Sequence, residues 1–156
     1  MCQVADFQPL LRSLNAKIII LHRDPRAIFN SRLKIMPQKN KVQMMERAIA
    51  KHCHIMLNNY KITHENHRHD QECLKSKVLN VKFEDITVDP MRYASELYNF
   101  ADLETPSFLE NWAKINSFID KNHVNQKFKV ELHAEQIKRV EFLCAEYMDY
   151  LGYRRV

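Results

Sequence analysis

The sequence predicts an α/β domain in which a short parallel sheet is flanked by helices. Two apolar stretches, Ile18–Leu21 and Val78–Val81, have the short length and β-branched content of strands. An amphipathic stretch over residues 41–60 lies between them and can form the helical crossover that parallel strands require. We therefore expect the two strands to be parallel neighbours, with this helix packed against one face of the sheet.

The first strand leads directly into a helix. Lys17–His22 is a run of Ile and Leu without polar alternation, a pattern typical of a strand that is covered on both faces. Asp24 can cap the next helix, and Pro25 suits its first position because the missing N–H would have no partner there. We expect this helix to extend to Lys34, before Pro37.

This strand-turn-helix unit, residues 17–34, has the features of an anion site. In open α/β sheets, ligands bind at the carboxyl ends of strands, where the helix N-terminus favours phosphate or sulfate. Arg23 follows the strand, and Ser31 returns to the same side of the helix about two turns later. A guanidinium group and a hydroxyl group could therefore hold one phosphate.

These two side chains also have a local alternative. Arg23 could form an ion pair with Asp24 or Glu84, and Ser31 could bond back to the helix carbonyl of Ala27. Either arrangement would satisfy the polar groups without a ligand.

Three other side chains could take part in proton transfer. His22 ends the first strand, where it could act as a base or point into a neighbouring layer. Glu84 and Asp85 follow the second strand, and paired carboxylates can serve in acid/base chemistry. Capping or ion pairing is the interpretation that we prefer for this pair, so we assign no catalytic residue.

Four stretches have apolar positions separated by steps of three and four residues, which indicates amphipathic helices. We interpret the Met-rich stripe and Trp112 as parts of the core. Asp89 with Pro90, and Thr105 with Pro106, are start signals for the second and third helices, and Gly152 can end the fourth. The stripes are Val42, Met45, Ile49, Cys53, Met56 and Tyr60; Met91, Ala94, Leu97, Tyr98 and Ala101; Phe108, Trp112, Ile115 and Ile119; and, in a terminal helix over residues 134–151, Ile137, Val140, Cys144, Tyr147 and Leu151.

Residues 61–77 are polar and predict a surface connection. Histidines, a carboxylate and a thiol gather here and could bind zinc, but the paired spacing of structural zinc sites is missing. We therefore prefer a solvated loop and expect no metal. The residues concerned are His64, His67, His69, Asp70 and Cys73.

At the strand-turn-helix unit the chain resembles a known family. The stretch RDPRAIFNSR, residues 23–32, resembles the 3′-phosphate-binding motif of the carbohydrate sulfotransferases. These are Golgi enzymes that sulfate sugar hydroxyls with 3′-phosphoadenosine 5′-phosphosulfate (PAPS). In the family, the first Arg and the Ser of this motif hold the 3′-phosphate of the nucleotide. The resemblance implies the same role for Arg23 and Ser31.

Two later stretches are similar to the same family, in the same order. LNVKFEDITVDPMRYASELYNFADL, residues 79–103, resembles its strand, Tyr-Glu-Asp turn and following helix, with Phe83 in place of the Tyr. Glu131–Tyr153 resembles its terminal helix. The resemblance implies a P-loop NTPase-like sulfotransferase fold, PAPS as co-substrate, a glycan acceptor and a Golgi location. It also implies a membrane anchor, which we expect only in a longer form.

A weaker similarity adds two lysines to the expected nucleotide site. The family often carries Asn-Ser followed by Lys-Trp-Arg, and Asn116-Ser117 and Lys127-Phe128-Lys129 resemble this pattern. Cations that flank an aromatic ring can hold phosphate and stack on adenine. Lys127 and Lys129 are therefore further candidates, although Lys lacks the planar fork of Arg.

Gly152 is the only glycine in the sequence. A loop that cradles phosphate needs glycines, and the family holds the 5′-phosphosulfate with such a loop ahead of the RDPR-type motif. We therefore expect residues 1–156 to form an incomplete, C-terminal part of a sulfotransferase domain. Met1 could be an internal methionine, the start of a truncated gene model or the start of a short diverged protein. The alternative function is a non-catalytic module that binds a nucleotide or a sulfated glycan.

Charge and hydropathy restrict the partners only loosely. The net charge of +5 suits an anionic partner but is equally typical of an ordinary basic surface. We expect no nucleic-acid binding, because no recognised motif or aromatic-rich basic stripe is present. The longest aliphatic run, Ile18–Leu21, is too short to span a bilayer, and we find no targeting signal.

The four cysteines are Cys2, Cys53, Cys73 and Cys144. The luminal setting that the resemblance implies permits disulfides, and Cys53 with Cys73 is the pair that we consider first. The alternative is that Cys53 and Cys144, on apolar helix faces, are buried thiols.

Overall fold

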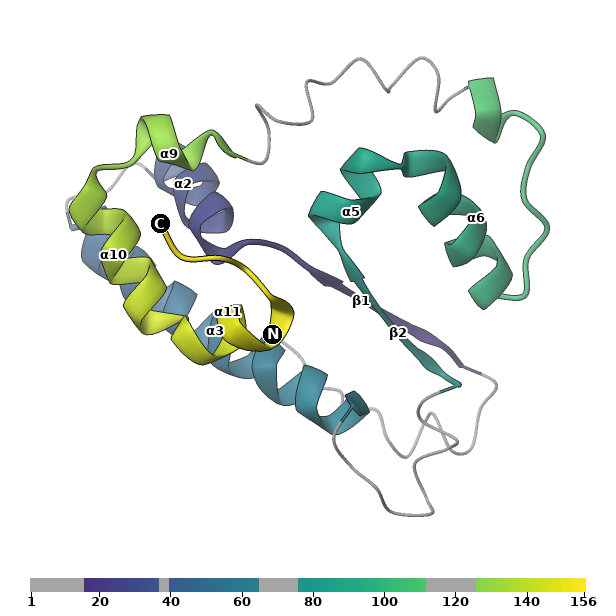
Figure 1. Ribbon diagram of the computed structural model, residues 1–156, viewed down its shortest axis with the longest axis horizontal. Coiled ribbons are helices and arrows are strands. Elements are labelled where there is room, and N and C mark those ends of the chain that lie inside the picture. The colour runs from purple at the N-terminus through teal and green to yellow at the C-terminus, as the bar shows by residue number, and fades with distance from the viewer. Residues whose placement is uncertain (1–15, 37–39, 65–75, 112–125) are drawn as a thin grey trace.

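Within the described residues, a two-stranded parallel sheet connects a helical body with a smaller pair of helices (Figure 1). β1 (Ile18–His22) pairs with β2 (Val78–Lys82) in a register that sets Ile18 opposite Val78. The predicted parallel pairing is confirmed. The computed structural model describes residues 16–36, 40–64, 76–111 and 126–156.

The first crossover helix, α2 (Pro25–Ile35), begins and ends close to the predicted residues. The side chain of Asp24 accepts a hydrogen bond from the backbone N–H of Arg26 at 2.9 Å, so Asp24 is the N-cap. Pro25 occupies the first helical position, where its lack of an N–H leaves no hydrogen bond unmade.

The second crossover helix, α3 (Lys41–His64), lies against the sheet with its last turns. The ring of Tyr60 meets that of His22 edge-on with centroids 5.8 Å apart, and Asn80 on β2 donates a hydrogen bond to the hydroxyl of Thr63 at 3.0 Å. The predicted packing of this helix on one face of the sheet is therefore confirmed.

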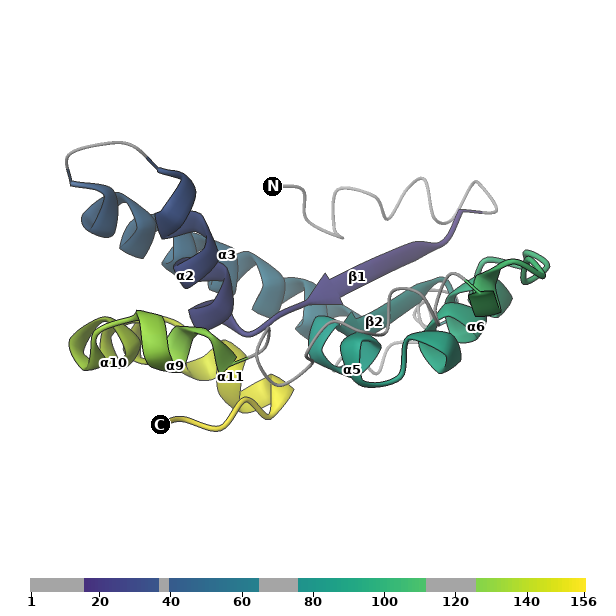
Figure 2. The same cartoon turned by 90° about the horizontal axis from the view of Figure 1, so that it is seen from above.

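The largest core lies between α2 and α3 and three helices from the end of the chain, α9 (Phe128–Glu131), α10 (Ala134–Leu143) and α11 (Ala145–Leu151). In the view of Figure 2, α2 lies above and α9, α10 and α11 lie below. The largest side chains that are less than 2% exposed include Phe29, Ile49, Val140, Tyr147 and Met148.

The predicted terminal helix is observed as two segments that meet at Cys144. Every member of its predicted apolar stripe is less than a tenth exposed, so this stripe lies in the core. Gly152 caps α11 with a φ of 70°, a left-handed conformation that favours glycine.

β1 is less covered than the sequence suggested. Ile20 and His22 are 7% and 1% exposed on the face toward α3, whereas Ile19 and Leu21 are 46% and 51% exposed on the other face. Successive side chains of a strand point to opposite faces. The prediction of a strand covered on both faces is therefore wrong, since an unbroken apolar run does not distinguish one covered face from two.

β2 passes directly into α5 (Phe83–Val88), and α6 (Pro90–Phe100) follows. α6 begins at the predicted signal, because the side chain of Asp89 accepts a hydrogen bond from the backbone N–H of Arg92 at 3.2 Å. No residue of α6 is buried, so its predicted apolar face is only partly covered. Figure 1 shows this pair on the opposite side of the sheet from α10.

Several predicted features lie outside the described residues. The third predicted apolar stripe begins at Phe108, which is 63% exposed. Its other members, Trp112, Ile115 and Ile119, are not among the described residues. Among the helices that the structure describes, none is long and apolar enough to cross a membrane.

A disulfide joins Cys53 of α3 to Cys144, with Cα atoms 5.5 Å apart. The predicted pairing of Cys53 with Cys73 is therefore wrong, and so is the alternative of two free thiols. Both bonded cysteines are 2% exposed on the faces where α3 and α10 pack together, a juxtaposition that sequence spacing does not contain. Cys2 and Cys73 lie outside the described residues.

We expect loss of this disulfide to lower the free energy of unfolding by about 2 to 4 kcal/mol, because a long-range cross-link restricts the unfolded chain. The bonded residues are 91 apart in the sequence. Denaturant unfolding with and without reductant measures the effect. The Cys53→Ala/Cys144→Ala variant should not respond to reductant, and equal midpoints for oxidised and reduced wild type would contradict the prediction.

Candidate anion-binding site

A cavity of about 230 Å³ opens beside the end of β1 and one face of α2. Arg23 and Ser31, the two residues that the sequence placed together, both line it. Whether they bind a nucleotide stays a prediction. The described lining residues are Arg23, Ala27, Asn30, Ser31, Lys34, Lys127 and Phe128.

Helical periodicity explains which residues of α2 reach this cavity. Ala27, Ser31 and Lys34 follow one another at steps of four and three, so their side chains share one face. Asn30 lies on the same side and was missed together with Lys34. Extending the spacing that selected Ser31 along the helix would have found both.

The guanidinium group of Arg23 is held by an aromatic ring and not by a carboxylate. It lies over the ring of Phe83, 4.4 Å from the ring centroid. Its Nε is buried, and no described residue accepts a hydrogen bond from it. A buried donor without a partner is costly and points to an acceptor that a ligand would supply.

The carboxylates that could have neutralised Arg23 are occupied elsewhere. Asp24 pairs with Arg26 at 2.7 Å. Glu84 accepts hydrogen bonds from the backbone N–H of Asp24 and from the hydroxyl of Tyr153, both at 2.9 Å. The alternative ion pair of Arg23 is therefore wrong. Glu84 has a structural role, but it neither caps α5 nor forms an ion pair within the described residues, so the preferred interpretation of capping or ion pairing is wrong in its detail.

Ser31 is exposed at the mouth of the cavity. Within the described ranges its hydroxyl forms no hydrogen bond, including none to the carbonyl of Ala27. The local alternative for Ser31 is therefore wrong as well, and this hydroxyl can donate to a bound anion.

The structure separates the two lysines that the sequence proposed for the site. Lys127 lines the cavity, whereas Lys129 is exposed and does not. Residues two apart on a helix lie on nearly opposite faces, which explains the difference. Phe128 is 2% exposed, and the guanidinium of Arg26 lies over its ring, 4.6 Å from the ring centroid. Phe128 is therefore a core residue at the cavity wall. Asn116 and Ser117 lie outside the described residues.

Glu131 lies near this cavity and engages two of its lining residues. Its carboxylate accepts hydrogen bonds from Lys34 at 2.6 Å and Asn30 at 2.5 Å. The hydrogen bond from Lys34, followed by that from Asn30, lowers the pKa of Glu131. Lys34 is thus partly neutralised, and Arg23 and Lys127 are the lining cations without an ion pair in the described part of the chain.

Beneath the cavity, a buried ion cluster holds α2 against α10. Arg26 pairs with Asp24 at 2.7 Å and with Glu141 at 2.5 Å, and all three are less than a tenth exposed. Glu141 also accepts a hydrogen bond from the backbone N–H of Val156 at 2.9 Å. The sequence analysis missed this cluster, because the partners are far apart in the chain.

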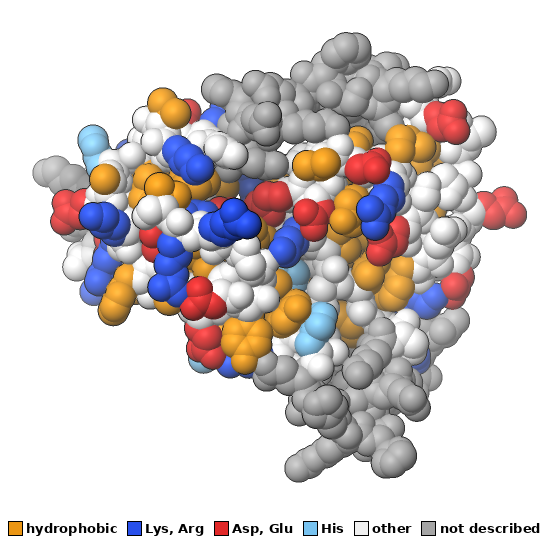
Figure 3. Space-filling model, in the orientation of Figure 1, with side chains coloured by type: hydrophobic (Ala, Val, Ile, Leu, Met, Phe, Trp, Pro, Cys, Tyr) orange, Lys and Arg blue, Asp and Glu red, His pale blue; other side chains and the backbone are white. Residues whose placement is uncertain are grey.

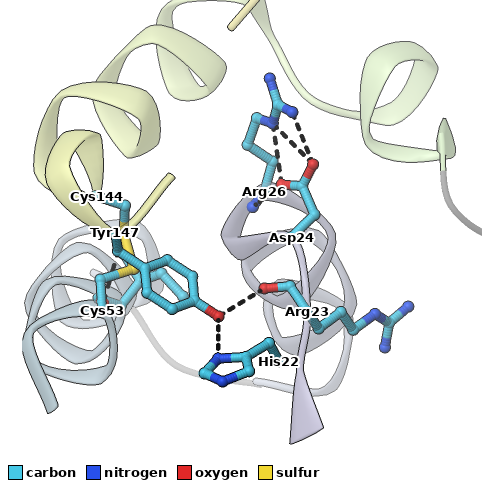
Figure 4. Close-up of a disulfide and its surroundings, with 8 residues drawn as sticks. His22, Arg23, Asp24, Arg26, Cys53, Cys144 and Tyr147 are labelled. Carbon is cyan, nitrogen blue, oxygen red and sulfur yellow. Dashed lines mark hydrogen bonds and ion pairs between the residues drawn. A yellow bond between two sulfur atoms is a disulfide. The ribbon is translucent and has the colours of Figure 1, made fainter. Parts of the chain in front are cut away.

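His22 belongs to a different polar network on the other side of the strand (Figure 4). Its Nε2 lies 2.8 Å from Oδ1 of Asn80, whose amide donates to Thr63. Nε2 is therefore the protonated nitrogen, and Nδ1 can accept from the hydroxyl of Tyr147 at 3.3 Å. Burial lowers the pKa of His22. His22 points into a neighbouring layer and away from the side chain of Arg23. This agrees with the second of the two interpretations, the first being a catalytic base.

The predicted metal alternative falls mostly outside the described residues. His64 stacks on Tyr60 with ring centroids 3.9 Å apart, whereas His67, His69, Asp70 and Cys73 are not described. In residues 16–36, 40–64, 76–111 and 126–156, no three His, Cys, Asp or Glu side chains are grouped to hold a metal ion.

Net charge alone does not select a site. On the face shown in Figure 3, basic and acidic side chains are interspersed. The candidate site therefore rests on the arrangement of Arg23, Ser31 and Lys127 around one cavity.

Comparison with known proteins supports the analysis of the strand-turn-helix unit. A family model described as "Sulfotransferase family" matches residues 13–107, which contain β1, α2, α3 and β2. The chain belongs to the sulfotransferase family. No solved structure matches this sulfotransferase chain.

The curated relatives of this sulfotransferase chain are carbohydrate sulfotransferases. Carbohydrate sulfotransferase 3 of Tetronarce californica is 24% identical over 99% of this chain and 40% of its own length. Carbohydrate sulfotransferase 2 of Homo sapiens is 25% identical over 98% of this chain and 38% of its own length. Carbohydrate sulfotransferase 5 of Mus musculus is 27% identical over 95% of this chain and 45% of its own length. The chain thus spans about two fifths of the length of these relatives.

Removing the central cation of the ion cluster should destabilise this sulfotransferase chain. We expect Arg26→Leu to lower the free energy of unfolding by about 3 to 5 kcal/mol, because two buried carboxylates lose their partner. The matched control is Arg32→Leu on the exposed side of the same helix, which should change stability by less than about 0.5 kcal/mol. Urea unfolding measures both, and equal effects of the two changes would contradict a stabilising role.

Stability should also rise with pH between about pH 5 and 7. Burial lowers the pKa of His22 and His52 from 6.5, so below pH 6.5 the unfolded chain binds more protons than the folded chain. The contribution of each histidine is complete above pH 6.5 and is lost as the pH falls. His22→Gln should reduce the slope of unfolding free energy against pH, and the exposed control His54→Gln should not. An unchanged slope in His22→Gln would show that His22 titrates normally.

Proposed function

We propose that this chain holds the 3′-phosphate of PAPS in an enzyme that transfers a sulfuryl group to a carbohydrate hydroxyl. The observation that carries the proposal is the convergence of Arg23, Ser31 and Lys127 on one cavity, with Nε of Arg23 buried and unpaired. A phosphate group supplies the acceptor oxygens that these donors lack.

Each residue would have a separate part in holding the nucleotide. Arg23 offers a planar fork that matches two phosphate oxygens, and the ring of Phe83 keeps this fork in place. Ser31 would donate one neutral hydrogen bond, and Lys127 would add a positive charge. These residues position the nucleotide and do not make or break the reacting bond.

When bound, PAPS supplies the sulfuryl group: sulfur bonds to the acceptor oxygen, the bond from sulfur to the phosphate oxygen breaks, the acceptor hydroxyl loses its proton, and 3′-phosphoadenosine 5′-phosphate leaves. Holding the 3′-phosphate would align the donor for in-line attack, so its binding energy contributes to the rate through positioning. The remaining fold would be P-loop NTPase-like, with the 5′-phosphosulfate held by other residues of the enzyme.

The relatives and the disulfide support the acceptor class and the location. The matched relatives are named carbohydrate sulfotransferases, which supports a glycan acceptor. The Cys53–Cys144 disulfide is stable in oxidising compartments, which is compatible with the Golgi lumen. We propose a membrane anchor only for a longer form of the protein.

One observation favours a second candidate, a non-catalytic module that binds the nucleotide or a sulfated glycan. The sequence contains a single glycine, Gly152, at a helix cap, so it has no glycine-rich phosphate loop of its own. The test uses a longer form of the protein that carries the remaining enzyme sequence. If this form binds the nucleotide but transfers no sulfuryl group, the non-catalytic module is favoured.

Calorimetry with 3′-phosphoadenosine 5′-phosphate tests the 3′-phosphate site. We expect Arg23→Ala to weaken binding by about 1.5 to 3 kcal/mol, the range for hydrogen bonds to charged groups, and Ser31→Ala to weaken it by less. Adenosine 5′-phosphate lacks the 3′-phosphate and should be affected little by either change.

Arg32→Ala is the matched control, because it removes an exposed guanidinium from the same helix outside the cavity. Equal losses for both nucleotides, or none for either, would mean that Arg23 and Ser31 do not hold the 3′-phosphate.

A further inference from the structure

We infer that a second cavity, on the other side of β1, binds one uncharged sugar unit of the acceptor glycan. This inference rests on the proposed function for the identity of the glycan as acceptor. The cavity measures about 280 Å³ and lies between the end of α3, the first turns of α6, and α11. The side chains that would contact the sugar are Tyr60, Tyr93, Tyr150, Asp85, Arg92 and Glu96.

The two cavities are close together but have separate walls. His22 lines the sugar cavity and Arg23 lines the anion cavity, and their described linings share no residue. Figure 4 shows the side chains of His22 and Arg23 pointing in different directions from the end of the strand. A glycan bound in the second cavity would therefore lie beside the nucleotide site without competing for its phosphate contacts.

The aromatic residues of this cavity come from three helices. Tyr60 is on α3, Tyr93 on α6 and Tyr150 on α11, and all three line the cavity. Tyr60 stacks on His64, with centroids 3.9 Å apart, and meets Tyr150 edge-on at 6.4 Å. These contacts hold the rings of Tyr60 and Tyr150 in place, and aromatic rings that combine apolar surface with a polar edge suit the apolar C–H face of a pyranose ring.

The polar groups of the cavity suit hydroxyl groups. Asp85, Arg92 and Glu96 are exposed, and none of them forms an ion pair within the part of the chain that the structure describes. A carboxylate accepts hydrogen bonds from sugar hydroxyls, and a guanidinium donates to ring and hydroxyl oxygens. Unpaired acceptors and a donor around aromatic rings thus match an alcohol-rich ligand.

Charge and size favour a single uncharged unit. Asp85 and Glu96 balance Lys82 and Arg92, the cationic lining residues, so the formal charge of the cavity is near zero. The described lining of the anion cavity, by contrast, contains three cations and no acid. The volume of about 280 Å³ is just below the roughly 300 to 1,000 Å³ of sites for larger small molecules, which fits one sugar ring.

Titration of the 156-residue chain with methyl β-galactoside and methyl β-N-acetylglucosaminide, followed by NMR to tens of millimolar, tests this inference. We expect at least one glycoside to bind and the Asp85→Asn/Glu96→Gln variant to bind it at least tenfold more weakly. These changes lie on the surface and preserve side-chain size, so folding should be retained. The matched control is Glu104→Gln/Glu110→Gln, which removes two exposed carboxylates outside the cavity.

Three results would overturn the inference: no binding of either glycoside, equal binding by the Asp85 and Glu96 variant, or tighter binding of methyl β-glucuronide than of the uncharged sugars. Binding of 3′-phosphoadenosine 5′-phosphate is measured in parallel. The Asp85 and Glu96 variant should bind this nucleotide normally, and Arg23→Ala should bind the glycoside normally. Failure of the sugar site is therefore distinguishable from failure of the nucleotide site.

Discussion

Asp24 connects the elements that meet at the end of the sheet. Its side chain caps α2 and pairs with Arg26, which in turn pairs with Glu141 on α10. Its backbone N–H donates to Glu84, directly after the start of α5. Asp24 thus connects the end of β1 to α2 and α10 through its side chain and to α5 through its backbone. These contacts are kept because a buried carboxylate is stable only when its hydrogen bonds and its charge are satisfied.

This arrangement leaves Arg23 free for a ligand. Asp24 and Glu84 are the two acids that could have paired with Arg23, and both are engaged with other donors. The guanidinium of Arg23 is instead supported by Phe83, which holds its position without neutralising its charge. The ion pair of Asp24 with Arg26 therefore leaves the charge of Arg23 without a carboxylate partner among the described residues.

The alternation of side chains along β1 separates two kinds of chemistry. His22 faces the buried network of Asn80, Thr63 and Tyr147, whereas Arg23 faces the cationic cavity. Consecutive residues of an extended chain point to opposite sides, so a cationic cavity and a cavity lined by aromatic rings and charges of both signs can share one strand end.

Short-range patterns predicted much of the fold and part of the site. The caps at Asp24, Asp89 and Gly152 and the stripe from Ile137 to Leu151 were predictable, because they depend on neighbours within a few turns. The parallel pairing of β1 and β2 was also predictable, since a long helical connection restricts the topology. Ser31 was located by the same helical spacing that would have found Asn30 and Lys34.

By itself, the sequence determined the two strands, the helices that begin after Asp24 and Asp89, the glycine cap at Gly152 and the juxtaposition of Arg23 with Ser31, because each follows from local backbone geometry. Only the tertiary structure decided that Cys53 bonds to Cys144, that Arg26 pairs with Glu141, and that Lys127 reaches the cavity while Lys129 does not. These choices depend on how helices far apart in the chain pack together. Spacing along the sequence carries no information on such distances.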